Sequence, residues 1–311
     1  MIMQTNWQGV TDTECVPCYG WHHCIHIHNN DIELFITTDV GPRIIHFGFL
    51  GEHNEFAVYP EMLGLTGGDS WRIYGGHRLW HAPEDPVRTY WPDNHPVHFE
   101  IHEGFVRFIQ PIEENTGLIK EIDIALHPER PQVRVTHRLR TQNLWPIPLA
   151  PWALSVMAPG GVAILPLPPR GTHPEMLAPS STLTLWPYTN MSDPRWTWGE
   201  RFILLRQEPG NATPQKIGAY TPDGWVAYAH QDHVFIKQFQ VIADAAYPDM
   251  NSTVELFTNG EMLEVETLGP LRVAAPGDEV THTELWTLAR HIPQPQSETD
   301  VIHAILPLIE G

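Results

Sequence analysis

The chain has 311 residues, of which 42% are hydrophobic and 18% are charged. This composition excludes a disordered protein and supplies enough apolar side chains for a core, in one large β domain or in two smaller domains. The 18 Lys and Arg residues are outnumbered by 37 Asp and Glu residues, so the formal net charge is -19 and polyanions are repelled. We therefore expect a neutral ligand and no nucleic-acid partner.

The sequence contains no apolar run of the ~18 residues that a membrane-spanning helix requires. The opening segment MIMQTNWQGV also lacks the charged and apolar regions of a signal peptide. We expect a cytoplasmic protein without a membrane partner, and the oligomeric state stays open.

Three cysteines lie near the N-terminus and cannot all pair with one another, and a large domain needs no disulfide for stability. Cys15 and Cys18 have the spacing of a redox or zinc motif, but an ordinary turn is the alternative, since no second such motif follows. A set of possible zinc or copper ligands alternates along one predicted strand: His22, Cys24, His26 and His28. Adjacent ligands on one strand rarely complete a coordination shell, so we expect no metal and no cofactor.

Period-two hydrophobic patterns recur along the chain between Gly, Pro, Asn and Asp residues. They predict strands at 32–39, 43–50, 97–103, 105–110, 118–127, 132–140, 234–242, 252–258 and 281–290. The 30 prolines argue against long helices, and a short helix is expected only in ETDVIHAILPLIEG at the C-terminus. We predict an all-β protein, a large antiparallel β-sandwich over residues 1–293, followed by a tail or short helix over 294–311.

Three segments resemble parts of a known superfamily. ELFITTDVGPRIIHFGFLG (33–51) is similar to the opening of aldose 1-epimerase-like proteins, and MLEVETLGPLRVAAPGDEVTHTELWTL (262–288) is similar to their closing unit. WRIYGGHRLWHAPEDP (71–86) resembles the Gly-Gly segment of hexose-6-phosphate mutarotases, which has an Arg nearby. The resemblance implies a galactose-mutarotase-like sandwich in an uncharacterised branch of this superfamily, with an open cleft for a sugar.

The resemblance implies that Glu266 is the catalytic base, because Leu263 to Thr267 match the Glu-bearing strand of the family. Alternation places Glu264 and Glu266 on one face of that strand, which either lines the cleft or meets solvent. The family's catalytic acid is a histidine, but the matching segment NLWPIPLAPWALSVM presents Trp152 and contains no histidine. The nearest substitutes are His77 and His81.

Further residues are candidates for sugar binding. Arg72 and Arg78 could donate hydrogen bonds to hydroxyl groups, and Trp80 could stack on a pyranose ring. The aromatic, non-periodic segment 186–202 is typical of a binding loop, although its polar residues could simply hold the loop in place. Its candidates are Asp193, Arg195 and Trp196; Lys216, Lys237 and Asp249 are further possible hydrogen-bonding groups that nothing local selects.

These residues favour an aldose 1-epimerase or mutarotase that acts on a neutral sugar by acid–base catalysis. One alternative is a glycoside hydrolase or lyase, since carboxylates two residues apart on a strand lie about 6.5 Å apart, close to the inverting separation. The other is a non-catalytic carbohydrate-binding or sensing protein, in which Trp152 marks the loss of catalysis. The sequence identifies neither the sugar nor the linkage.

Overall fold

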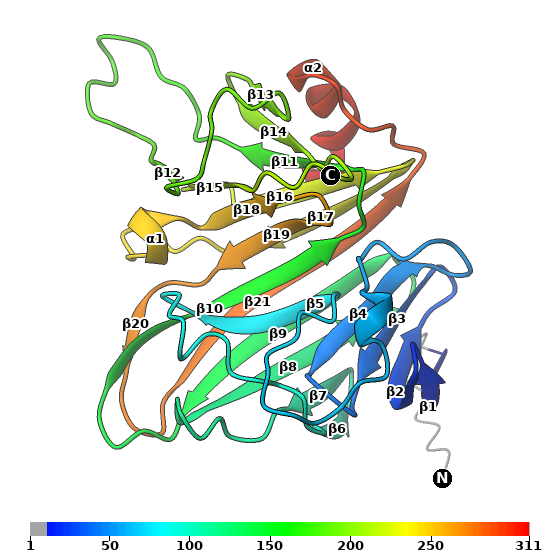
Figure 1. Ribbon diagram of the computed structural model, residues 1–311. Helices are drawn as coiled ribbons and strands as arrows, with labels where there is room; N and C mark the ends of the chain where they lie inside the picture. The colour runs from blue at the N-terminus through cyan, green and yellow to red at the C-terminus, as the bar shows by residue number, and fades with distance from the viewer. Residues whose placement is uncertain (1–10, 311) are drawn as a thin grey trace.

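The computed structural model describes residues 11–310, and almost all of its regular structure is antiparallel β-sheet (Figure 1). Two large sheets pack face to face, as the sequence predicted. Their inner faces form one hydrophobic core that takes residues from both sheets, including Phe47, Val135, Val265 and Trp286. The predicted all-β sandwich is confirmed.

The first sheet has 11 strands and carries the candidate site. In spatial order its strands are β1 (Thr11–Cys18), β2 (Trp21–His28), β3 (Ile32–Thr37), β4 (Arg43–Phe49), β5 (His77–Ala82), β10 (Ile147–Met157), β19 (Leu263–Leu268), β18 (Val254–Thr258), β15 (Gln215–Ala219) and β12 (Leu183–Leu185), with β20 (Arg272–Ala274) paired to β10. Strands from the beginning, middle and end of the chain therefore lie side by side at its centre.

The second sheet has 10 strands. Their order is β13 (Trp196–Trp198), β14 (Phe202–Arg206), β11 (Val162–Pro166), β16 (Trp225–His230), β17 (His233–Phe239), β21 (Glu279–Arg290), β9 (Gln132–Thr141), β8 (Leu118–Leu126), β7 (Phe105–Ile109) and β6 (His98–His102). Each of the nine predicted strand segments coincides with a strand of one of the two sheets. In β9 the predicted apolar face is fully buried: Val133, Val135, His137 and Leu139 are each at most 1% exposed.

The helical segments are short. They are η1 (Pro60–Met62), α1 (Pro248–Asn251) and a C-terminal run of α2 (Glu298–Asp300), η2 (Val301–Ile305) and α3 (Pro307–Glu310). Ser297 caps the last run, because its hydroxyl accepts from the Asp300 N–H while the Asp300 carboxylate accepts from the Ser297 N–H. Val301 and Ile305 pack against the second sheet, so the expected short C-terminal helix is confirmed.

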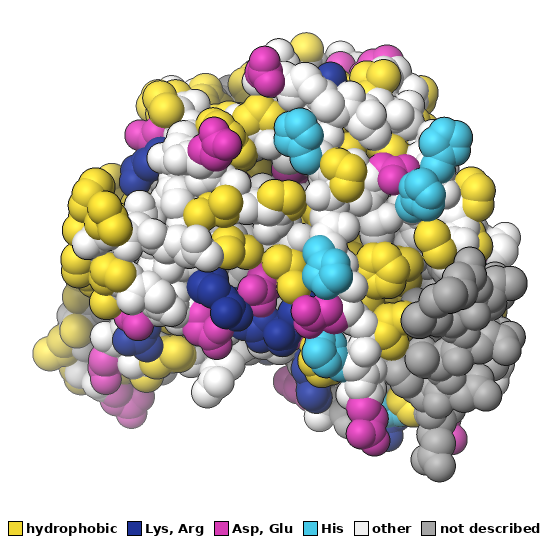
Figure 2. Space-filling view, turned by 90° about the horizontal axis from the view of Figure 1, so that it is seen from below, with side chains coloured by type: hydrophobic (Ala, Val, Ile, Leu, Met, Phe, Trp, Pro, Cys, Tyr) yellow, Lys and Arg dark blue, Asp and Glu magenta, His cyan; other side chains and the backbone are white. Residues whose placement is uncertain are grey.

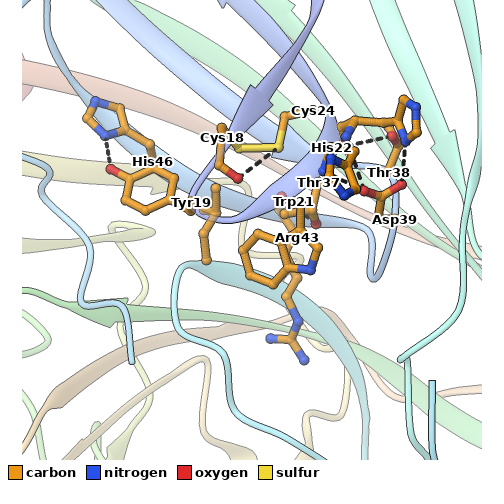
Figure 3. Close-up of a disulfide and its surroundings, with 12 residues drawn as sticks. Cys18, Tyr19, Trp21, His22, Cys24, Thr37, Thr38, Asp39, Arg43 and His46 are labelled. Carbon is orange, nitrogen blue, oxygen red and sulfur yellow. Dashed lines mark hydrogen bonds and ion pairs between the residues drawn. A yellow bond between two sulfur atoms is a disulfide. The ribbon is translucent and has the colours of Figure 1, made fainter. Parts of the chain in front are cut away.

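The N-terminal hairpin contains a disulfide that the sequence analysis did not predict. Cys18 pairs with Cys24 (Figure 3). Cys15 is free and exposed. On the exposed side of β2, Asp39 accepts hydrogen bonds from the backbone N–H groups of His22 and His23. With its sulfur in a disulfide, Cys24 is not a metal ligand in the row of possible ligands along this strand.

The surface is mixed in charge. Figure 2 shows Lys and Arg side chains lying beside Asp and Glu side chains on the face seen from below, with histidines scattered among apolar groups. Within residues 11–310, no helix has the length and apolar character to span a bilayer.

A buried ion pair lies inside the core. The Lys237 ammonium is 3.1 Å from Oε1 of Glu284, and both side chains are fully buried. Burial is the largest single effect on Glu284 and would raise its pKa, but the charge of Lys237, the neighbouring histidines and a hydrogen bond from Thr267 together lower the pKa to about 2. The second sheet therefore contributes both charges to the buried interior.

We predict that Lys237→Met lowers the free energy of unfolding by about 3–5 kcal/mol, because the Glu284 carboxylate would remain buried without its partner. Denaturant unfolding followed by circular dichroism measures the change. Arg170→Met is the matched control: it removes an exposed ion pair with Glu200 and should cost at most about 1 kcal/mol. Equal losses in the two variants would contradict this account of the core.

Candidate functional site

A pocket of about 340 Å³ lies on the face of the first sheet that points away from the core. Its floor is formed by five neighbouring strands, in the order β5, β10, β19, β18 and β15. Small-molecule sites in proteins span roughly 300–1,000 Å³, so this pocket has the size for a ligand such as one sugar ring. The residues around it are Tyr59, Glu61, Met62, Trp71, Ile73, Arg78, Trp80, Glu84, Tyr90, Trp152, Leu154, Tyr188, Lys216, Phe257, Glu261, Met262, Glu264 and Glu266.

Strand β19 supplies two carboxylates to the pocket. Glu264 and Glu266 line it, while Leu263 and Val265 point into the core between the sheets. This arrangement follows from the two-residue period of a strand, which sends successive side chains to opposite faces. Of the two alternatives that the sequence left open, the structure has the polar face of this strand lining a pocket rather than open solvent.

Glu266 is fully buried and is held by two donors. Its Oε2 accepts from the Trp152 indole N–H at 2.7 Å and from the Lys216 ammonium at 3.2 Å. Lys216 is also 2.8 Å from Oε2 of Glu255, which is fully buried on β18. The second oxygen of Glu266, Oε1, is buried and has no hydrogen-bond partner among the described residues.

Burial and charge act against each other in this cluster. Burial raises the pKa values of Glu255 and Glu266, and the Lys216 ammonium partly offsets this in both. Burial would lower the pKa of Lys216, but Glu266 and Glu255 outweigh it and raise the pKa well above its ordinary value. Two carboxyl groups thus share one cation, and both have pKa values above that of an ordinary carboxyl group, as is common at functional sites.

On the other side of the pocket, Arg78 and Glu264 form an ion pair of 2.9 Å between Nη2 and Oε1. The Arg78 guanidinium lies 4.4 Å from the ring centre of Trp80 and 5.7 Å from that of Trp71. Its Nε and Nη1 have no hydrogen-bond partner in the described part of the chain. Arg78 therefore has donors to spare for an oxygen-rich ligand.

Aromatic and acidic side chains from loops complete the walls of the pocket. Trp71, Tyr59, Tyr90 and Tyr188 supply apolar faces, and burial is the main cause that raises the pKa of Tyr188 to about 12. Five Glu side chains and only two cations line the space: Glu61, Glu84, Glu261, Glu264 and Glu266 against Arg78 and Lys216. The pocket is therefore acidic.

Five of the residues proposed from the sequence meet in this pocket: Glu266, Glu264, Arg78, Trp80 and Trp152. Sequence analysis did not select Lys216, Tyr59, Trp71, Tyr90 or Tyr188. The sequence around Lys216 gave little indication of a pocket residue. Lys216 lies in β15, a short buried strand, and the strands beside it are far away in the sequence. The aromatic residues lie in irregular loops that carry no periodic pattern.

The expectation that His77 and His81 share the cleft with Glu266 is corrected by the structure. Both alternate with Arg78 and Trp80 on β5 and therefore point to the opposite face of the sheet. His77 is fully buried, and its ring nitrogens lie 2.8 Å from Ser155 Oγ and 2.7 Å from His137 Nε2. Burial is the largest cause that lowers the pKa of His81 to about 3, so this ring stays neutral in the interior.

The paired glycines before β5 lie against neighbouring backbone. A Cβ at Gly75 would lie 2.1 Å from the Ala57 carbonyl oxygen, and one at Gly76 would lie 2.3 Å from the Ile44 carbonyl oxygen. Both glycines have positive φ angles, of 101° and 71°. They allow three backbone segments to pack closely, which positions β5.

The remaining candidates lie outside the pocket. Arg72 donates to the Gly67 carbonyl and the Tyr74 hydroxyl, and it supports the loop beside the pocket. Asp193 and Arg195 pair with each other at 2.8 Å, and the Trp196 indole donates to the Asn190 carbonyl. Asp193, Arg195 and Trp196 thus make polar contacts that hold segment 186–202 in place. The sequence had left this structural role open as the alternative to sugar binding.

No protein-family model matches the sequence, and no similar sequence was found among curated proteins. Solved structures do match the fold. A Klebsiella pneumoniae protein proposed to be an aldose 1-epimerase aligns with a TM-score of 0.61 and 11% identity, over 96% of this chain and 86% of that one. A galactose mutarotase-like protein from Lactobacillus casei aligns with a TM-score of 0.54 and 10% identity, over 86% of this chain and 100% of that one.

This chain has the galactose mutarotase-like fold. A TPR-domain-containing protein from Parabacteroides distasonis also matches, with a TM-score of 0.57 and 13% identity over 88% of this chain. The chain spans about half of that protein, since 49% of it is covered. At these identities the similarity describes the fold alone, and function has to be argued from the pocket.

We predict that Lys216→Met raises the pKa values of Glu255 and Glu266 further, because the cation that offsets their burial is lost. Carboxyl ¹³C NMR of glutamate-labelled protein measures both titrations. The folded variant should then lose stability as pH rises from about 4.3, the ordinary pKa of Glu, through the raised pKa values, since in this range the unfolded chain binds fewer protons. Lys216→Arg keeps the charge and should titrate like the wild type; unchanged titration in Lys216→Met would contradict the cluster described above.

Proposed function

We propose that the pocket binds a neutral monosaccharide and that Glu266 transfers a proton during anomer exchange, in the manner of an aldose 1-epimerase. The observation that carries the proposal is the position of Glu266: a buried carboxyl group of raised pKa that lines an aromatic-walled pocket and has one oxygen, Oε1, without a hydrogen-bond partner among the described residues. The fold similarity to a galactose mutarotase-like protein supports the same class of ligand.

The pocket offers complementary groups to each part of a sugar. Trp71 and Trp80 supply the flat apolar surfaces that pack against the C–H faces of pyranose rings. Arg78 and Lys216 donate hydrogen bonds to hydroxyl oxygens, whereas Glu264 and Glu266 accept them. The excess of carboxylates disfavours phosphorylated or acidic sugars, because a ligand anion would meet net negative charge at short range.

In the proposed reaction, the Glu266 carboxylate removes the proton of the anomeric hydroxyl group as the bond between C1 and the ring oxygen breaks, so the negative charge passes to the ring oxygen. After rotation about the C1–C2 bond, the ring oxygen attacks C1 from the other face, and Glu266 returns the proton to the anomeric oxygen. A positioned general base of this kind contributes about 10²–10⁴-fold. Among the described residues, no histidine lines the pocket to act as the acid. Arg78, with two unused donor nitrogens, is the group that would stabilise negative charge on the ring oxygen.

A specific contact favours a second function, that of a non-catalytic sugar-binding protein. Trp152 stands in the strand where the catalytic histidine was expected, and its indole N–H donates to Glu266. An indole N–H does not act as an acid at neutral pH, so this position supplies a hydrogen bond and no proton. A protein that binds sugar without turnover would have this arrangement.

Catalysis is tested by ¹H NMR of freshly dissolved α-glucose and α-galactose, in which anomer exchange is followed directly. We expect faster exchange with the wild type, and a loss of about 10²–10⁴-fold in Glu266→Gln. Glu208→Gln, which changes a Glu outside the pocket, is the control and should act like the wild type. No acceleration across a panel of neutral hexoses would rule out the epimerase.

Binding is tested separately by isothermal titration with the same sugars. We expect Trp80→Ala to weaken binding at least tenfold, about 1.4 kcal/mol or more, since a large aromatic contact surface is lost. Trp198→Ala removes a half-exposed Trp outside the pocket and should leave binding unchanged. Binding without turnover would establish the second function, and absence of binding by any neutral sugar would overturn both.

A further inference from the structure

A second cluster of ionisable side chains lies outside the pocket, at the junction of the two sheets. His53 and Glu55 follow β4 of the first sheet, and His230 ends β16 of the second. One nitrogen or carboxylate oxygen from each of these three residues lies within 4.8 Å of the others. His230 thus lies beside His53 and Glu55, although more than 170 positions separate it from them in the sequence.

The three side chains have polar atoms that the protein leaves unused. Nε2 of His53, Oε2 of Glu55 and Nδ1 of His230 are buried and have no hydrogen-bond partner among the described residues, and the nearest charged atom to His53 Nε2 is Oε1 of Glu55 at 3.4 Å. Glu55 is fully buried, and His230 is only 9% exposed. Since more than about 90% of buried polar groups in proteins are hydrogen-bonded, three unused atoms at one point indicate a missing binding partner.

The remaining atoms of these groups are held in place by neighbours. Oε1 of Glu55 is 2.7 Å from Nδ1 of His233, which leaves Oε2 free. The His230 ring is hydrogen-bonded to the backbone of Pro159, which can only accept. Contacts of this kind orient the ligands of metal sites, where a histidine usually donates its second N–H to a carbonyl or carboxylate.

A second group of similar composition provides a comparison. His77, His137 and Glu284 also approach one another, but their atoms are already engaged. His77 and His137 contact each other at 2.7 Å, and Glu284 is paired with the Lys237 ammonium at 3.1 Å. A cation would be repelled there, whereas the group of His53, Glu55 and His230 has unused ligand atoms.

We propose that His53, Glu55 and His230 bind a divalent first-row transition-metal ion, with Zn²⁺ as the best match. Two imidazole nitrogens and one carboxylate oxygen are a common ligand set for Zn²⁺, and three protein ligands leave the fourth position to water. Ligands about 2.0–2.1 Å from a tetrahedral zinc lie about 3.3 Å apart, so the side chains would close in on the ion. The His53 side chain is 25% exposed, which provides both the freedom to rotate and a path for the ion.

The proposal is tested by titration of the full chain with Zn²⁺ in competition with a chromophoric chelator. We expect one tight equivalent per chain and a higher melting temperature in its presence. His53→Gln, Glu55→Gln and His230→Gln should each weaken binding by more than the roughly 10–100-fold that loss of an outer-shell partner causes. Circular dichroism confirms that each variant is folded.

Two controls separate this site from adventitious binding by other histidines. His98→Gln removes an exposed histidine beside Glu100 and should leave the tight equivalent intact. The double variant His22→Gln/His28→Gln removes histidines of the N-terminal strand and should also bind normally. Loss of the tight equivalent in either control, or its retention in His53→Gln, would overturn the proposal.

One measurement does not depend on the folding of any variant. In ¹⁵N NMR of the wild-type chain, the ring nitrogens of His53 and His230 should shift with the first equivalent of Zn²⁺. The ring of His137, which is fully buried elsewhere in the core, should not shift. If the first equivalent leaves the signals of His53 and His230 unchanged, the ion binds elsewhere and the assignment is wrong.

Discussion

The two-residue period of its strands is the constraint on which the first sheet depends, because both of its faces are used. One face meets the second sheet across the core, and the other forms the pocket floor. In each central strand, side chains that suit the core must therefore alternate with side chains that suit the pocket. In β19, Leu263 and Val265 alternate in this way with Glu264 and Glu266. A shift of pairing by one residue would place both carboxylates in the core, so the register of this sheet determines the pocket and the core together.

Charges are buried on both sides of this sheet, and in each place they occur as opposites. Lys216 lies between Glu255 and Glu266 on the pocket side, and Lys237 is paired with Glu284 on the core side. Buried pairs rarely raise stability above that of apolar side chains, yet removal of one partner is costly. These buried charges are thus better explained by a role in positioning than by a gain in stability. In the pocket, they position the Glu266 carboxyl group and determine its pKa.

The fold could be predicted from the sequence because alternation is a local signal, and β9 shows it in full. The pocket could be predicted only in part, because a local pattern does not show which face of a strand lines the pocket and which packs in the core. No strand was predicted at 77–82, because both faces of β5 are buried and the segment lacks a period-two hydrophobic pattern. Alternation was therefore not used to separate Arg78 and Trp80 from His77 and His81. Lys216 was named only as a possible hydrogen-bonding group, because no local pattern places it in the pocket. It contacts Glu266, 50 residues away in the sequence, only through the pairing of β15, β18 and β19.

The Lys216 ammonium also lies over two indole rings, 4.8 Å from the ring centre of Trp152 and 4.7 Å from that of Trp186. A free lysine side chain carries about 2 kcal/mol of rotamer entropy, which a flexible pocket would lose whenever a ligand arrived. Here two rings and two carboxylates immobilise the side chain when the protein folds. The ordering cost therefore falls on folding rather than on binding, and the positive charge stands in position before any ligand enters the pocket.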